Sequence, residues 1–263
     1  LLQERIPRVS TFYSPSLHEG DLSAGTGNEL PMRVINTPHT AIPEVQLLSN
    51  GRYKVINTNS GGGYSRWKNI AVTRWREDAT CDNWGTFCYI RDVENNTFWS
   101  SAHQPSLHQT NKYEAVFSQG RAEFRRTDFA LETHTEIVVS PEDDIELRRV
   151  HITNRSRKKR IIEITSYAEV VLVPALAEEM HPAFSNLFVE TAIDEKHHAI
   201  ICTRRPRAAD EQVPWMFHLM KVTDADIKSI SYETDRRRFI GRGHSINNPT
   251  AMSNDAPLSG SNG

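Results

Sequence analysis

Apolar and polar residues alternate over most of the chain between residues 46 and 222, and this period of two predicts β-strands. Asn50-Gly51 lies between two strand-like runs and predicts a hairpin, as does Gln119-Gly120, because these residues tolerate positive φ. Short polar turns separate further strand-like stretches at residues 131–139, 145–153, 160–173, 187–193, 199–203 and 215–222. The pattern predicts an all-β fold of stacked antiparallel sheets, with one short helix near residues 176–180.

The two ends of the chain differ from this pattern. Residues 1–30 contain neither a basic region nor the apolar region of a secretory signal, and the chain does not begin with Met. We expect these residues to be a tail or linker from a preceding domain. Residues 31–243 carry the strand pattern, whereas residues 244–263 are rich in Ser, Asn, Gly and Pro, a composition that favours a loop or linker.

Charge and cysteine content narrow the classes of partner. The 263 residues carry 31 basic and 33 acidic side chains, a net charge of −2, so no general field favours nucleic acid or an anionic membrane. No apolar run approaches the length that a bilayer requires. Three cysteines are too few for a disulfide scaffold and favour a reducing compartment. We therefore expect a cytoplasmic segment without membrane or nucleic-acid contact.

One stretch, residues 61–89, concentrates groups suited to a ligand. It holds three of the five tryptophans beside arginines, carboxylates and three consecutive glycines. Aromatic planes next to planar donors suit an extended, hydroxyl-rich ligand such as a sugar chain. The candidate substrate-binding residues are Tyr64, Arg66, Trp67, Arg74, Trp75 and Trp84. The alternative is that these side chains pack in the sandwich and seal its edge, with the glycines forming a backbone turn.

Other candidate sites are weaker. Cys81 and Cys88 form no CxxC pair, and the chain has neither a phosphate-binding loop motif nor a GxSxG motif, so we predict no metal site and no cofactor. His134 shares a strand face with Glu132 and Glu136, which is the nearest approach to a sugar-epimerising His–carboxylate pair. Residues 235–242 alternate Asp, Arg and apolar residues and could anchor a last strand through ion pairs.

Five ordered segments, together nearly spanning the chain, resemble a known family: residues 72–92, 140–154, 165–171, 181–191 and 232–243. They are similar to the amino-terminal β-sandwich of glycoside hydrolase family 94, formerly glycosyltransferase family 36, and in particular to the phosphorylase-like region of cyclic β-1,2-glucan synthases. The resemblance implies a galactose-mutarotase-like β-supersandwich. It also implies that the general acid and the phosphate-binding groups belong to a separate α/α-barrel, so no residue of this chain is assigned a catalytic role.

The resemblance further implies the partners. They are a β-glucan or another oligosaccharide, the barrel domain of the same protein and a second copy in a homodimer, with the parent anchored in the inner membrane through other domains. Residues 244–263 would lead toward the barrel. Three functions stay open: a non-catalytic domain that supports the barrel, an autonomous glucan-binding module, and a mutarotase-like enzyme. Exposure of Tyr64, Trp67, Trp75 and Trp84 distinguishes the first two, because buried rings cannot stack on sugar.

Overall fold

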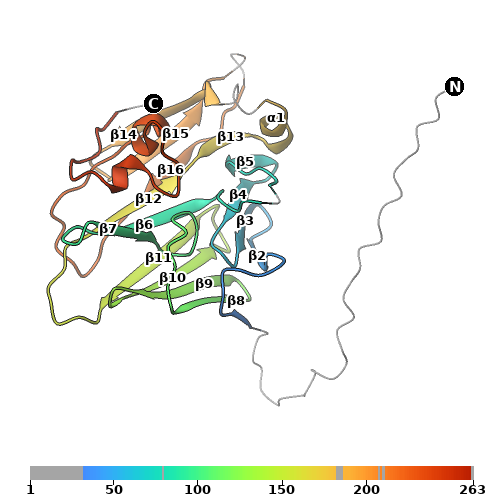
Figure 1. Ribbon diagram of the computed structural model, residues 1–263. Helices are drawn as coiled ribbons and strands as arrows, with labels where there is room; N and C mark the ends of the chain where they lie inside the picture. Colours follow the sequence, from blue (N-terminus) through green and yellow to red (C-terminus); the bar gives the residue numbers. More distant parts are fainter. Residues whose placement is uncertain (1–31, 79, 182–185, 207, 209–210, 262–263) are drawn as a thin grey trace, which may run out of the picture. The chain divides into compact units, whose positions relative to one another are not determined.

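The computed structural model describes residues 32–78, 80–181, 186–206, 208 and 211–261. Within them the strands form four sheets, all of whose strand pairs are antiparallel (Figure 1). The prediction of an all-β fold is confirmed. The predicted tail over residues 1–30 lies outside the described residues.

Two of the four described sheets have five strands each. Sheet A has the order β1-β8-β9-β10-β11, with bounds Arg33–Ile35, Tyr113–Ser118, Arg121–Asp128, Leu131–Val139 and Glu146–Asn154. Sheet B has the order β13-β5-β4-β3-β2, with bounds Val170–Pro174, Ile70–Thr73, Gly63–Trp67, Tyr53–Thr58 and Val45–Ser49. Both predicted hairpins are present, because Ser49 pairs with Lys54 and Ser118 pairs with Arg121.

Two three-stranded sheets complete the described fold. Sheet C has the order β12-β6-β7, with bounds Ile162–Ala168, Thr86–Asp92 and Thr97–Ser100. Sheet D has the order β14-β15-β16, with bounds Val189–Asp194, Ala199–Arg204 and Met216–Leu219. The stretch 160–173, predicted as one strand-like run, therefore divides at Glu169 into β12 of sheet C and β13 of sheet B.

The main core lies between sheets A and B. Leu48 and Val55 of sheet B share one buried cluster with Phe117 and Phe124 of sheet A. Sheet D joins the same cluster through Cys202. Sheet C contributes Tyr89 to a second cluster with residues from the C-terminal part of the chain. Burial of these apolar faces supplies the main favourable term in folding.

The described residues also contain short helices. The helix α1, Ala175–Met180, follows β13 directly, as the sequence predicts. The helix α3, Arg236–Ile240, begins after Asp235, whose side chain accepts a hydrogen bond from the backbone N–H of Arg237. The expected ion pairs are present, since Arg236 lies 2.8 Å from Glu169 and both Arg237 and Arg238 lie near Asp235. Residues 236–240 are nevertheless a helix and not a strand, because the N-cap starts a helical turn that buries Phe239 and Ile240.

Residues 244–261 are irregular, as their composition suggests, yet they pack onto sheet C. The 3₁₀ helix η1, Thr250–Met252, brings Met252 into the second cluster together with Ile246. The carbonyl oxygen of Ile246 accepts a 2.6 Å hydrogen bond from the Tyr89 hydroxyl. Ala251 and Leu258 pack against the same cluster. Arg91 bonds the carbonyl oxygen of Asn254 and the carboxylate of Asp255, so apolar and polar contacts together hold this part of the chain against the sandwich.

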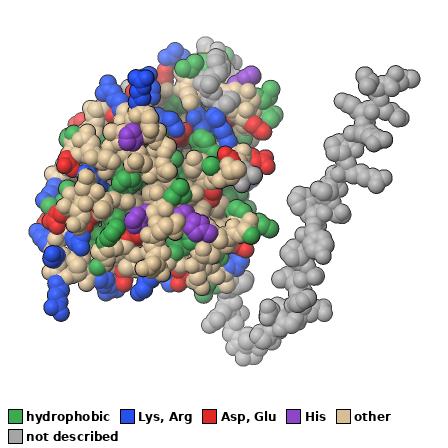
Figure 2. Space-filling model, in the orientation of Figure 1, with side chains coloured by type: hydrophobic (Ala, Val, Ile, Leu, Met, Phe, Trp, Pro, Cys, Tyr) green, Lys and Arg blue, Asp and Glu red, His purple; other side chains and the backbone are tan. Residues whose placement is uncertain are grey.

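Acidic and basic side chains are interspersed on the face of the molecule seen in Figure 2, in keeping with the net charge of −2. Among the described residues, no helix has the length and apolar character needed to cross a bilayer.

Candidate functional site

The strand β4 carries the start of the predicted site on one of its faces. Alternation along a strand places Tyr64 and Arg66 on one face and Ser65 and Trp67 on the other. The Arg66 guanidinium carbon lies 4.7 Å from the centroid of the Tyr64 ring. Tyr64 pairs with Ile56 of β3, so both lie on the face of sheet B that points away from the core residues Leu48 and Val55.

The segment after β5 brings a second aromatic ring to this face. Trp75 is 40% exposed, and its ring centroid lies 5.4 Å from that of Tyr64 at an interplanar angle of 54°. Farther along the same loop, Trp84 is half-buried and the Arg76 guanidinium carbon lies 5.6 Å from its ring centroid. We call Tyr64, Arg66, Trp75, Arg76 and Trp84 the aromatic–arginine surface.

Glycine backbone and the half-buried carboxylate of Asp82 fix this loop against β4. The N–H of Gly63 donates a 2.7 Å hydrogen bond to the carbonyl oxygen of Trp84, which ties the loop to the start of the strand. Asp82 accepts hydrogen bonds from the hydroxyls of Thr58 and Ser60. A side chain at Gly62 would collide with Asp82, because a Cβ there would lie 2.1 Å from its carboxylate oxygen.

The environment of Asp82 is unusual for a carboxylate. Burial raises its pKa, and the two hydroxyl donors oppose this only in part. The hydroxyls supply neutral hydrogen bonds but no compensating positive charge. The role visible in the structure is to hold the buried residues 61–63 beneath the loop.

Two arginines of the surface, Arg66 and Arg76, have guanidinium N–H groups available to donate hydrogen bonds to a ligand. Within the described ranges, neither Arg66 nor Arg76 forms an ion pair, and each instead lies over an aromatic ring. A guanidinium has five N–H donors in a plane, and stacking on a ring leaves its edge free for hydroxyl acceptors. The surface thus combines exposed ring area with unpaired planar donors.

Comparison of the sequence with known proteins identifies the family of this chain. The family model described as glycosyl hydrolase 94, supersandwich domain, matches residues 28–263. The chain belongs to the glycosyl hydrolase 94 supersandwich family.

The relatives of this supersandwich domain act on sugars, according to their names. The cyclic β-(1,2)-glucan synthase NdvB of Rhizobium meliloti (strain 1021) is 36% identical over 265 aligned residues, which cover 100% of this chain and 9% of the relative. An N,N′-diacetylchitobiose phosphorylase of Vibrio furnissii is 24% identical over 84% of the chain and 27% of its own length. A solabiose phosphorylase of Paenibacillus borealis is 23% identical over 63% of the chain and 20% of its own length. The chain therefore spans only a small part of these relatives.

Two of the sequence-predicted site residues of the supersandwich domain lie apart from the aromatic–arginine surface. Trp67 is on the opposite face of β4, packs against the main core and donates a 2.6 Å hydrogen bond to Asp144. Arg74 is buried and bonded to Glu169, Glu178 and Asn186. Trp67 lies apart from the surface because side chains alternate between the two faces of a strand. Arg74 lies apart because its ion pairs with Glu169 and Glu178 hold it in a buried position.

The His–carboxylate pair considered for sugar epimerisation lies on sheet A. His134 Nε2 is 2.8 Å from the buried Glu123, a residue that the sequence did not single out. Glu136 lies in the same group, whose possible ligand atoms are all within 4.8 Å of one another. Arg121 and Arg149 both bond Glu136, and they hold its pKa low, the hydrogen bond from Arg149 contributing most. Cationic neighbours make this a poor place for a metal ion.

Arg76 completes the surface although its sequence context gave little reason to select it. Arg76 follows Trp75 and so lies in the tryptophan-rich stretch of the sequence. Its contact with Trp84 depends on the path of the loop, which the sequence pattern does not predict.

Proposed function

We propose that this supersandwich domain is a non-catalytic part of a glucan-processing enzyme and that it supports a separate catalytic barrel while its aromatic–arginine surface holds a glucan chain. The observation that carries the proposal is the exposed Trp75 ring beside Tyr64, with Arg66 stacked on Tyr64. Sugar rings present apolar C–H faces to aromatic planes and hydroxyls to planar donors. The surface offers both.

We assign the parent to the cyclic β-1,2-glucan synthase type. The 36% identity to such a synthase over the whole chain supports this assignment. The chemistry in the parent would be inversion at the anomeric carbon, with an acid on the barrel protonating the leaving oxygen. The further partners we propose are the barrel and a second copy of the chain, in a cytoplasmic setting with anchoring through other parts of the parent.

Kinetics of the full-length parent test the binding role. Tyr64→Ala, Arg66→Ala and Trp75→Ala should each raise KM for β-1,2-glucan several-fold with kcat and Tm nearly unchanged, because they remove contacts made equally to substrate and transition state. Phe217→Ala is the matched control, since Phe217 is 64% exposed on another sheet. Unchanged KM in all three variants would refute the binding role.

A second candidate is an autonomous glucan-binding module, which the exposure of Trp75 within this chain favours. Calorimetric titration of the 263-residue chain with β-1,2-glucan separates the two. Saturable binding by the chain alone indicates a module. Binding that requires the full-length parent indicates a surface completed by the barrel.

A further inference from the structure

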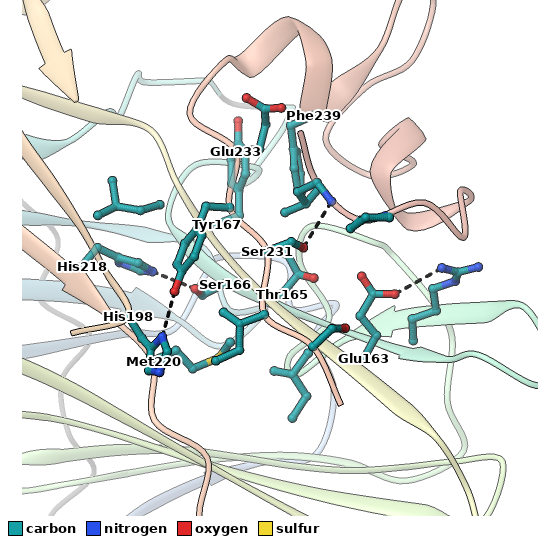
Figure 3. A pocket seen from close by; sticks show the side chains of 18 of the residues that line it. Glu163, Thr165, Ser166, Tyr167, His198, His218, Met220, Ser231, Glu233 and Phe239 are labelled. Carbon is teal, nitrogen blue, oxygen red and sulfur yellow. Dashed lines mark hydrogen bonds and ion pairs between the residues drawn. The ribbon is translucent and has the colours of Figure 1, made fainter. Parts of the chain in front are cut away.

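A cavity of about 1550 Å³ lies between β12 of sheet C and sheet D. The irregular segment 220–235, between β16 and α3, runs along it, and residues 255–258 close one side. Figure 3 shows side chains from several of these elements lining the space. Ligand pockets commonly occupy about 300–1,000 Å³, so this space is large enough for an extended molecule rather than a single small one.

Acidic and basic side chains are nearly balanced in the wall, because seven Lys or Arg residues and six Asp or Glu residues line the cavity. Arg91 Nη1 lies 3.2 Å from Glu163, and Glu169 bonds both Arg74 at 3.1 Å and Arg236 at 2.8 Å. Each pair joins residues that both line the cavity. A wall that carries nearly equal numbers of both charges, several of them paired, exerts little net field on its contents, which favours a neutral ligand over an ionic one.

Neutral hydrogen-bonding groups face the same space. Ser166 Oγ and His218 Nε2 are 2.7 Å apart, and His198 Nδ1 lies 3.1 Å from the Tyr232 hydroxyl. These four residues come from β12, β16 and two connecting segments, so the groups converge from separate parts of the chain. Figure 3 labels three of them, Ser166, His198 and His218. Burial lowers the pKa of His218 and keeps its ring neutral near pH 7. Hydroxyl and imidazole groups that pair once can each form further hydrogen bonds.

Apolar side chains line the same cavity. They include Ile164, Ile200, Met220 and Ile230. Paired charges, converging neutral hydroxyl and imidazole groups and aliphatic surface together match a molecule with apolar faces and hydroxyl edges.

We propose that this cavity binds a neutral oligosaccharide, a segment of the glucan, at a site separate from the aromatic–arginine surface. The proposal rests on the proposed function, because it takes the glucan as the ligand class. The two sites are neighbours: Arg74 lines the cavity and the next residue, Trp75, is exposed in the aromatic–arginine surface.

Calorimetric titration of the 263-residue chain with a linear β-1,2-linked gluco-oligosaccharide tests the site. Ser166→Ala and His218→Gln should each weaken binding about tenfold, the effect of losing one hydrogen bond. Met220→Trp, which fills part of the cavity from an exposed position, should weaken it more. Thermal denaturation identifies any variant that fails to fold. If His218→Gln or Met220→Trp fails to fold, the affinity of the conservative variant Ser166→Ala decides whether the cavity binds the oligosaccharide.

Trp75→Ala serves as the comparison variant. If Trp75→Ala abolishes binding and the three cavity variants bind normally, the inference is overturned while the proposed function stands. If the cavity variants lose binding and Trp75→Ala does not, the inference stands and the aromatic–arginine surface does not bind glucan in the isolated chain, so its role is decided by the kinetics of the full-length parent. No saccharide binding by the chain, or binding of only the apolar dye anilinonaphthalene sulfonate in the cavity, would also overturn it.

Discussion

Trp84 and Trp99 are two tryptophans with different surroundings, and their removal should have different costs. Trp99 is 0% exposed in a cluster with Ile90 and Leu131, whereas Trp84 is half-buried under Arg76. We expect Trp99→Ala to lower the free energy of unfolding by about 3–5 kcal/mol. Trp84→Ala should lower it by about 1–2 kcal/mol, because part of the ring is already in water. Urea unfolding measures both, and equal losses would contradict the assignment of Trp84 to the surface.

His103 should make stability depend on pH in the acidic range. Burial, followed by the charges of His39 and Arg126, lowers the pKa of His103 from 6.5 to about 4. Between these values the unfolded chain binds a proton that the folded chain does not, so the free energy of unfolding falls as the pH falls from about 6.5 to about 4. The loss should be no more than about 3 kcal/mol.

The control for this prediction is His103→Gln, which has no titrating ring. Its stability should fall less than that of the wild type over the same pH interval. Parallel stability curves for the two proteins would show that His103 does not contribute.

At the scale of elements, the hairpin β3–β4 depends on the absence of a side chain at Gly63. Gly63 has φ of +144°, and a Cβ there would lie 1.8 Å from the carbonyl oxygen of Ile56. Gly63→Ala should therefore cost at least about 2 kcal/mol. Gly120, in the β8–β9 turn, has φ of +75° and open space around it, so Gly120→Ala should cost about 1 kcal/mol from backbone strain alone. Equal costs in thermal unfolding would refute the steric explanation.

Some elements were predictable because their signals are local. Asn50-Gly51 and Gln119-Gly120 fix their hairpins through turn chemistry that lies within the turn. The division of residues 160–173 at Glu169 was not predictable, because both halves have strand character and only their partners β6 and β5 place them in different sheets. Asp235 was a readable helix cap that the alternation of the following residues obscured.

The candidate surface was predictable in composition but not in arrangement. Alternation along β4 alone would have separated Trp67 from Tyr64 and Arg66. The contact of Trp75 with Tyr64 depends on the course of an irregular loop, which no sequence period encodes. The cavity joins His198 and His218 to residues of β12, and these long-range contacts leave no motif.

At the scale of the whole molecule, we expect the 263-residue chain to release no glucose 1-phosphate from β-1,2-glucan in the presence of phosphate. The reason is that the proposed function assigns the acid and the phosphate site to a separate barrel. A coupled assay for glucose 1-phosphate, with the full-length parent as positive control, measures this. Release above a no-protein blank would overturn the assignment.

The contacts of Glu169 limit the order in which parts of the domain can fold during synthesis. Its carboxylate, between β12 and β13, is bonded by Arg74 from the start of the loop after β5, by the Tyr167 hydroxyl and by Arg236 of α3. Arg74 lies 95 positions before Glu169 in the chain and Arg236 lies 67 positions after it. The chain is synthesised from the amino terminus, so Glu169 cannot pair with Arg236 until α3 has left the ribosome. We therefore expect sheets B and C to reach their final packing only near the end of translation of the domain.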